Sequence, residues 1–337
     1  MEGHSRNMLR YPSLHFIKKL LKQLAMANPR WSLFFPVRSD GVRVLMYHRI
    51  CSNRRFFLGV DPRRFREEMR WLARYCRLIS VDELPDAAKT PSRHRRSVLV
   101  TFDDGFRDYH DHAYPILEEL RIPAVVFVAT AFLDHGGAIW TDAVQFALAT
   151  TRERRIAPPW NRAIVHELDS PEARERAAQA CKTFLKGIPD VERRSAVSAL
   201  LGELGVDQAA IEATYGRQML TWDEVRATRE FTTYGGHSHT HPILSQLDDD
   251  GIEYEIATCQ RRLTEELGAP ARHFAYPNGR SVDFDARVQA ALRRHGFESA
   301  FSTNDGRVTA DVDWMAIPRK AAGGSTLADF AFSVGFQ

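Results

Sequence analysis

The sequence lacks any uninterrupted run of about 18 apolar residues, so we expect no membrane-spanning helix. It also lacks a CxxC pair. Its four cysteines lie far apart, which is typical of reduced thiols in a cytosolic protein rather than of a disulfide scaffold. The 46 basic and 43 acidic residues nearly cancel, and a net charge of +3 creates no overall field for a nucleic acid. These absences argue against an integral membrane protein, a secreted disulfide-rich domain and a nucleic-acid binder.

Residues 1–40 read as a separate N-terminal helical segment. Between Leu14 and Leu24, leucine and isoleucine recur at helical spacing with three lysines among them. The lysines interrupt what would be the apolar core of a secretory signal peptide, so we expect no such signal. The amphipathic helix either packs on the domain that follows or lies on the inner membrane surface, and both interpretations remain open. We therefore expect a cytoplasmic protein, with peripheral membrane contact through this helix as the alternative.

The rest of the chain alternates strand-like and helix-like patterns. Short apolar runs typical of buried parallel strands cover Val42–Tyr47, Val98–Phe102, Ala124–Val128, Thr232–Tyr234, His273–Tyr276, Ser299–Ser302 and Trp314–Ile317. Between them, Asp61 and Pro62 begin one helical pattern and Gly268 ends another. This alternation predicts an α/β fold with a parallel sheet, and seven or eight such units favour a barrel over an open sheet.

A stretch from about residue 138 to about residue 220 breaks the alternation. Most of it is charged, lacks strand-like runs and reads as two or three helices. We interpret it as a helical insertion in a loop of a barrel that occupies residues 41–337. A separate small helical domain is the alternative.

Two clusters of polar residues follow predicted strands. Asp103 and Asp104 stand side by side after an apolar strand, and burying either carboxylate is costly unless a cation pairs with it. His237, His239 and His241 follow another strand. An extended backbone would point all three imidazoles the same way. A turn would instead bring His237 and His241 together and turn His239 away. Pro242 and the neighbouring hydroxyl residues favour the turn.

The two clusters have the composition of a catalytic metal site. In a parallel barrel the functional groups collect at the carboxyl ends of the strands, so the carboxylate and the imidazoles are expected to meet there. One carboxylate and two imidazoles bind a divalent metal while leaving coordination positions open for water. The pattern therefore indicates a catalytic rather than a structural centre.

Four motifs together resemble the polysaccharide deacetylases, which form carbohydrate esterase family 4 and share the NodB homology domain. These motifs are "VLMYHRI", "TFDDG", "GGHSHTHPIL" and "HFAYPNGR". The resemblance covers roughly Val42 to Arg319. It implies a distorted (β/α)7 barrel, here with a helical insertion, and metal-dependent removal of acetyl groups from sugars.

Carried over to this chain, the resemblance assigns Asp104, His237 and His241 as metal ligands and Asp103 as the general base. Zinc is the expected metal, with cobalt, nickel or iron as alternatives. A bound metal lowers the pKa of its water to about 7, and a carboxylate can take the proton as the water attacks the acetyl carbonyl.

The chain departs from the common family pattern in two places. Many members supply the general acid from a late histidine, but no histidine follows Ile317 here. His48, at the end of the first strand, is the expected acid, since the first and last strands of a closed barrel are neighbours. This arrangement is similar to the subgroup that acts on exopolysaccharides. Many members also have an arginine where this chain has Ala275, and Arg319 is a candidate replacement.

The motif "HFAYPNGR" and a late tryptophan are expected to line the substrate pocket. Tyr276 ends a predicted strand, and Pro277 and Asn278 follow it. The stretch "DVDW" ends at Trp314, whose ring could stack on a sugar or lie in the core.

The sequence therefore predicts a hydrolase that removes acetyl groups, above all N-acetyl groups of amino sugars, from a polysaccharide or glycan precursor. Two alternatives stay open: an amidohydrolase of the same fold that acts on a small non-sugar amide, and a non-catalytic barrel that binds a glycan.

Overall fold

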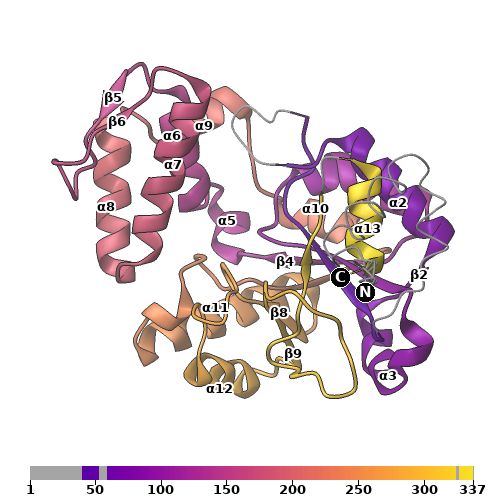
Figure 1. Cartoon of the computed structure of the whole chain (residues 1–337). Helices are drawn as coiled ribbons and strands as arrows, with labels where there is room; N and C mark the ends of the chain where they lie inside the picture. The colour runs from indigo at the N-terminus through magenta and orange to yellow at the C-terminus, as the bar shows by residue number, and fades with distance from the viewer. Residues whose placement is uncertain (1–39, 53–58, 324–325, 337) are drawn as a thin grey trace, which may run out of the picture.

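A curved parallel sheet forms the centre of the molecule in the computed structural model, which describes residues 40–52, 59–323 and 326–336 (Figure 1). The strands along its path lie in the order β10-β1-β3-β4-β7-β8-β9, and all are parallel. Their bounds are β1 Arg43–Tyr47, β3 Ser97–Phe102, β4 Ala124–Val128, β7 Thr232–Gly236, β8 His273–Ala275, β9 Ser299–Phe301 and β10 Lys320–Ala321. A two-residue strand, β2 (Arg77–Leu78), also pairs with β3. The structure is the distorted barrel with a helical insertion that was predicted.

The last strand lies later in the sequence than predicted. The prediction was Trp314–Ile317, whereas β10 begins at Lys320. Met315 and Ala316 donate backbone hydrogen bonds to Asp313, at 2.9 Å each, so Trp314 lies in a turn. Ile317 then bridges to Phe301 of β9, and β10 pairs with β1 three residues later. The short segment from Ile317 to β10 therefore connects the two edges of the curved sheet.

The strands alternate their side chains between two apolar layers, because successive residues of a strand point to opposite faces. Val44, Leu99 and Val125 point into the barrel and form one cluster. Leu45 and Val100 point outwards and pack against the surrounding helices. Both sets are completely buried, which explains why these strands read as continuous apolar runs.

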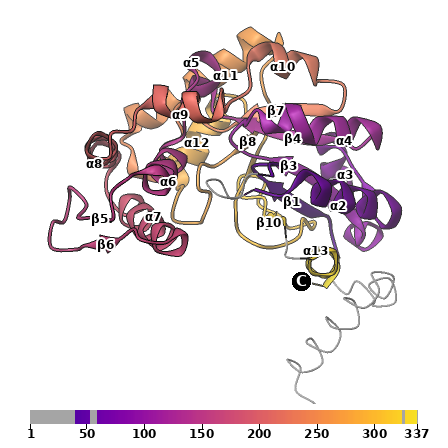
Figure 2. The same cartoon turned by 90° about the horizontal axis from the view of Figure 1, so that it is seen from above.

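Helices cover the outside of the sheet (Figure 2). They are α2 Pro62–Tyr75, α3 Leu84–Lys89, α4 Tyr114–Glu119, α5 Thr130–His135, α10 Trp222–Ala227, α11 Asp249–Leu267, α12 Ala286–Arg294 and α13 Leu327–Phe336. The predicted caps are present: Asp61 accepts a hydrogen bond from the backbone of Arg63, and Gly268 ends α11 in the left-handed conformation.

Four further helices form a group beside the barrel (Figure 1). They are α6 Trp140–Thr150, α7 Pro171–Lys186, α8 Asp190–Glu203 and α9 Gln208–Tyr215, with a two-stranded hairpin of β5 Arg155–Ile156 and β6 His166–Glu167. The group has its own apolar cluster around Leu148, Leu185 and Leu200. It joins the barrel through the chain before α6 and after α9, so it lies within the predicted insertion range.

The predicted amphipathic helix of the N-terminal segment lies outside the described residues. Across the described part of the chain, no helix combines the length and the apolar character needed to cross a bilayer.

Candidate metal centre and active-site cavity

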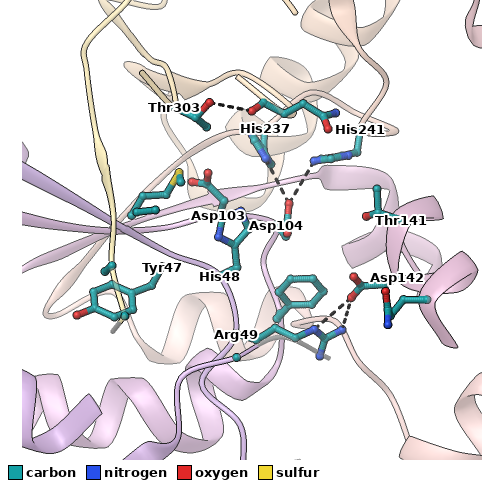
Figure 3. Close-up of a pocket in the computed structure, with 18 of the residues that line it drawn as sticks. Tyr47, His48, Arg49, Asp103, Asp104, Thr141, Asp142, His237, His241 and Thr303 are labelled. Carbon is teal, nitrogen blue, oxygen red and sulfur yellow. Dashed lines mark hydrogen bonds and ion pairs between the residues drawn. The ribbon is translucent and has the colours of Figure 1, made fainter. Parts of the chain in front are cut away.

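A cavity of about 830 Å³ opens at the carboxyl ends of the strands. The residues that line it include His48, Asp103, Asp104, His237 and His241, which follow β1, β3 and β7. The structure thus brings five of the predicted catalytic and metal-binding residues into one cavity (Figure 3).

The sheet register places the Asp pair beside the end of β1. Tyr47 pairs with Phe102, and the next residue, Asp103, donates its backbone N–H to the Tyr47 carbonyl at 3.0 Å. Asp104 then adopts a positive φ of 77°. This left-handed residue ends the strand geometry, so two adjacent carboxylates can both reach the cavity. Such a conformation costs about 1–3 kcal/mol for a residue other than glycine and is typical of functional sites.

The histidine segment forms the predicted turn. Ser238 and His241 have φ values of 64° and 61°, and the His241 backbone N–H donates to the Ser238 hydroxyl at 3.0 Å. His239 points away from the cavity and bonds Thr130 Oγ1 through Nδ1 at 2.9 Å. The turn therefore separates His237 and His241 from His239, as the hydroxyl residues and Pro242 indicated.

Asp104, His237 and His241 offer ligand atoms that all lie within 4.8 Å of one another. The Nε2 atoms of the two histidines are 3.3 and 3.2 Å from Asp104 Oδ1. All three side chains are buried. Burial alone would raise the pKa of Asp104, but its close contacts with both imidazoles hold it well below its ordinary value. The carboxylate is therefore ionised and suited to a cation.

The donor and acceptor pattern of these residues fits a divalent cation. His237 Nδ1 is 2.7 Å from the Ala275 carbonyl, which can only accept, so Nδ1 carries the proton. In neutral His237 the Nε2 lone pair then faces a carboxylate oxygen, another acceptor. Protonating both imidazoles would place two cationic rings with centroids 4.8 Å apart. One metal ion would instead accept a lone pair from each of the three groups.

Arg319 holds the predicted base. Its guanidinium donates to the two oxygens of Asp103 at 2.6 and 2.8 Å, and to the Ser302 carbonyl at 2.9 Å. Arg319 is completely buried and Asp103 is 2% exposed. Ala275, which stands where many family members have an arginine, is also completely buried. The candidate replacement thus reaches the carboxylate from a segment 216 residues further along the chain.

The ion pair sets the protonation state of the base. Burial alone would raise the pKa of Asp103, but the charges of Arg319 and His237 outweigh burial and lower the pKa. A bidentate arginine also fixes the plane of the carboxylate. Asp103 is therefore an ionised, oriented carboxylate next to the candidate metal ligands.

His48 lies at the mouth of the cavity. It follows β1, is exposed, and its ring points towards Asp103 and Asp104 (Figure 3). A positive charge on His48 would lower the pKa of both carboxylates, since all three side chains line the same cavity. The structure therefore brings the candidate acid to the same end of the barrel as the candidate base.

The predicted substrate-pocket residues divide into two groups. Tyr276 and Asn278 line the cavity, although the Tyr276 hydroxyl donates to the Met315 carbonyl at 2.8 Å and is not free. Pro277 and Trp314 are not among the lining residues. Trp314 packs against the apolar cluster inside the barrel, since the turn at Asp313 keeps it away from the cavity. Its predicted contact with a sugar is therefore not supported.

Glu255 is a site residue that the sequence interpretation missed. From α11 its buried carboxylate accepts hydrogen bonds from the backbone N–H groups of His239 and Thr240, at 2.8 and 2.7 Å, and from the Thr240 hydroxyl. It thereby holds the turn that presents His241. The sequence does indicate that Glu255 is unusual, because it is a charged residue on the same buried face of α11 as Ile252.

A parallel barrel with one carboxylate and two imidazoles at the carboxyl ends of its strands has the architecture of a metal-dependent hydrolase. The family model "Polysaccharide deacetylase" matches residues 90–154 and 195–300, about half of the chain. The unmatched residues between these two ranges lie in the helical insertion. The chain belongs to the polysaccharide deacetylase family, which is metal-dependent, and Asp104, His237 and His241 form its candidate metal site.

Individual relatives agree with this family. YxkH of Bacillus subtilis, which is named as a polysaccharide deacetylase, is 31% identical over 94 residues, 27% of this chain and 33% of its own length. The match thus spans about one third of that relative. Two solved structures show the same fold. The Streptococcus pyogenes deacetylase PplD has a TM-score of 0.58 at 17% identity, covering 89% of this chain and all of PplD. IcaB from Ammonifex degensii has a TM-score of 0.55 at 19% identity, with the same coverage.

Proposed function

We propose that this protein is a metal-dependent carbohydrate deacetylase that hydrolyses N-acetyl groups of amino sugars in a polysaccharide or a glycan precursor. The observation that carries the proposal is the buried set of Asp104, His237 and His241 beside an ionised Asp103 in an open cavity. Family membership supports the choice of an acetylated glycan as substrate. The arrangement with His48 directly after the first strand favours the exopolysaccharide-type subgroup.

The ion held by Asp104, His237 and His241 would supply Lewis acidity, which lowers the pKa of a water and polarises the acetyl carbonyl. Zinc suits one carboxylate and two imidazoles, and cobalt, nickel and iron remain alternatives.

The protein side chains would move the protons. Asp103, held ionised by Arg319, takes a proton from the water that attacks the acetyl carbon. His48, on the open side of the cavity, gives a proton to the leaving nitrogen as the carbon–nitrogen bond breaks. The products are acetate and a free amine.

Acetate release from N-acetylated chito-oligosaccharides tests the proposal. The zinc-loaded full chain should release acetate, a chelator should abolish the release, and added metal should restore it. Asp103→Asn should lower kcat by about 10²- to 10⁴-fold while the protein retains its metal. If no acetate appears with any of the four metals, the proposed activity is wrong. Metal content then separates an amidohydrolase with another substrate, which binds metal, from a non-catalytic barrel, which does not.

A further inference from the structure

One wall of the active-site cavity comes from the helical insertion rather than from the barrel. Helices α6 and α7 contribute polar and charged side chains to it: Thr141, Asp142, Gln145, Gln179, Lys182 and Lys186. In Figure 3, Thr141 and Asp142 lie on the side of the cavity opposite Asp103. A substrate that reaches the candidate metal centre therefore passes along this wall.

Two sets of contacts attach the wall to the barrel. Asp142 of α6 pairs with Arg49, which follows β1, at 2.8 Å. Gln246, five residues after the ligand His241, donates to the Lys186 carbonyl at 2.7 Å and accepts from Arg193 of α8 at 2.6 Å. Lys186 thus has a defined position relative to the segment that carries the metal ligands.

Within the described part of the chain, Lys186 differs from the other lysine and arginine side chains of the cavity in that its ammonium has no partner. Arg280, from the loop after β8, donates to both oxygens of Asp283 at 3.0 and 3.1 Å. Lys182 donates to Gln145 Oε1 at 2.7 Å. Within the described ranges, no hydrogen bond or ion pair involves the Lys186 ammonium, although the residue is half-buried.

The surroundings of Lys186 favour an added negative charge. Burial lowers its pKa, and the positive charges of Arg280 and Lys182 lower it further; Asp283 and Asp104 offset this only in part. The carboxylate of Asp104 is itself directed at two imidazoles, so it does not serve as a partner for the lysine. An anion placed between Lys186 and its basic neighbours would relieve this repulsion.

We infer that Lys186, flanked by Lys182 and Arg280, binds an anionic oxygen group of the substrate, a phosphate or a carboxylate, while the acetyl group lies at the metal centre. The identity of the substrate as a glycan rests on the proposed function. A lysine is a compact point charge that suits either anion. The helical insertion then serves as the wall that selects an acidic glycan over a neutral one.

A half-buried lysine also has an ordinary explanation, in which its stem covers apolar surface and its ammonium reaches water. The two explanations differ in what a charge-removing substitution does. Loss of an anion site changes the preference between acidic and neutral ligands, whereas loss of a solvated lysine does not.

Ligand binding to the zinc-loaded full chain separates the anion-site explanation from that of a solvated lysine. The probes are glucose 6-phosphate, glucuronate and glucose, measured by equilibrium titration at low ionic strength. We expect at least one acidic sugar to bind about ten- to hundredfold more tightly than glucose, as a charge-assisted contact provides. The phosphate and carboxylate arms show which anion is preferred. Lys186→Gln should remove most of the preference, and Lys186→Arg should retain it. Lys89→Gln is the matched control, because Lys89 is an exposed lysine of α3 paired with Asp86.

The inference is overturned if neither acidic sugar binds more tightly than glucose. It is equally overturned if Lys186→Gln keeps the preference, since the anion would then bind the metal or another cation. The binding readout does not depend on hydrolysis. Acetate release from neutral oligosaccharides without any acidic preference would refute the subsite and leave the proposed function intact. A preference for acidic sugars without acetate release from any acetylated sugar would refute the proposed function and leave the anion subsite intact.

Discussion

The buried pair of Arg319 and Asp103 allows the sharpest test of how the active site is stabilised. Arg319→Met replaces the guanidinium with an apolar side chain and leaves Asp103, which is 2% exposed, without its partner. Removing one member of a buried ion pair costs about 3–5 kcal/mol, because the other charge remains buried and uncompensated. Solvent screening does not reduce this cost, since Arg319 is completely buried.

Urea unfolding of the metal-loaded protein measures this cost. With an m-value of about 3 kcal/mol/M for a domain of this size, the unfolding midpoint should fall by about 1–1.7 M. Arg319→Lys should lose less stability than Arg319→Met, because it keeps the charge. It should still lose some, because lysine cannot donate two parallel hydrogen bonds to the carboxylate.

The double variant with Asp103→Asn and Arg319→Met isolates the interaction. Once both charges are removed, no buried charge lacks a partner. The double variant should therefore be more stable than the sum of the single losses predicts, by about 2 kcal/mol or more. A midpoint for Arg319→Met equal to that of the wild type, or additive losses in the double variant, would refute the reasoning.

Three further predictions follow from other parts of the cavity and its support. His48→Ala should lower kcat by about 10²- to 10⁴-fold if His48 is the acid, and a kcat within about threefold of wild type rules that role out. Burial raises the pKa of Glu68 from 4.5 to about 7, despite its hydrogen bond from Tyr47 and its contact with Arg64. The folded state therefore holds a proton that the unfolded state has lost between these pH values, so this group costs stability as the pH rises. Relative to wild type, Glu68→Gln should gain about 3 kcal/mol between pH 4 and pH 8 in urea unfolding, and a constant difference would contradict this. Glu255→Ala should weaken zinc binding about 10- to 100-fold by releasing the turn that presents His241, and an unchanged Kd in a competition titration would show that the turn holds without it.

Much of the fold could be predicted because the local signals agree with the tertiary structure. Strands buried on both faces, such as β3 and β4, carry apolar residues at almost every position, and the caps at Asp61 and Gly268 are local signals. The segment around Trp314 was misread because an apolar run there is interrupted by hydrogen bonds to Asp313. Such a turn depends on one side chain, and the hydropathy of the sequence gives little indication of it.

The candidate site was predictable where its residues are adjacent in the chain. The choice of His237 and His241 over His239 depended on the turn, which Pro242 made visible. Arg319 was named only as a candidate through the family resemblance, because it reaches Asp103 through closure of the sheet, which no local pattern in the sequence encodes.

The cavity wall formed by the helical insertion could not be predicted either. The position of Lys186 depends on how α7 docks on the barrel through Gln246, and no local pattern encodes that contact. Helix periodicity indicates which face of α7 is apolar, but not which of its polar residues meets the cavity.

Metal content after loading is the most direct test of the central claim. The wild-type chain, incubated with zinc and dialysed extensively, should retain about one ion per chain by elemental analysis, and His237→Ala and His241→Ala should retain far less. His239→Ala should keep the ion, since that imidazole faces Thr130 rather than the cavity. Equal zinc content in the wild type and in both ligand variants would contradict the account.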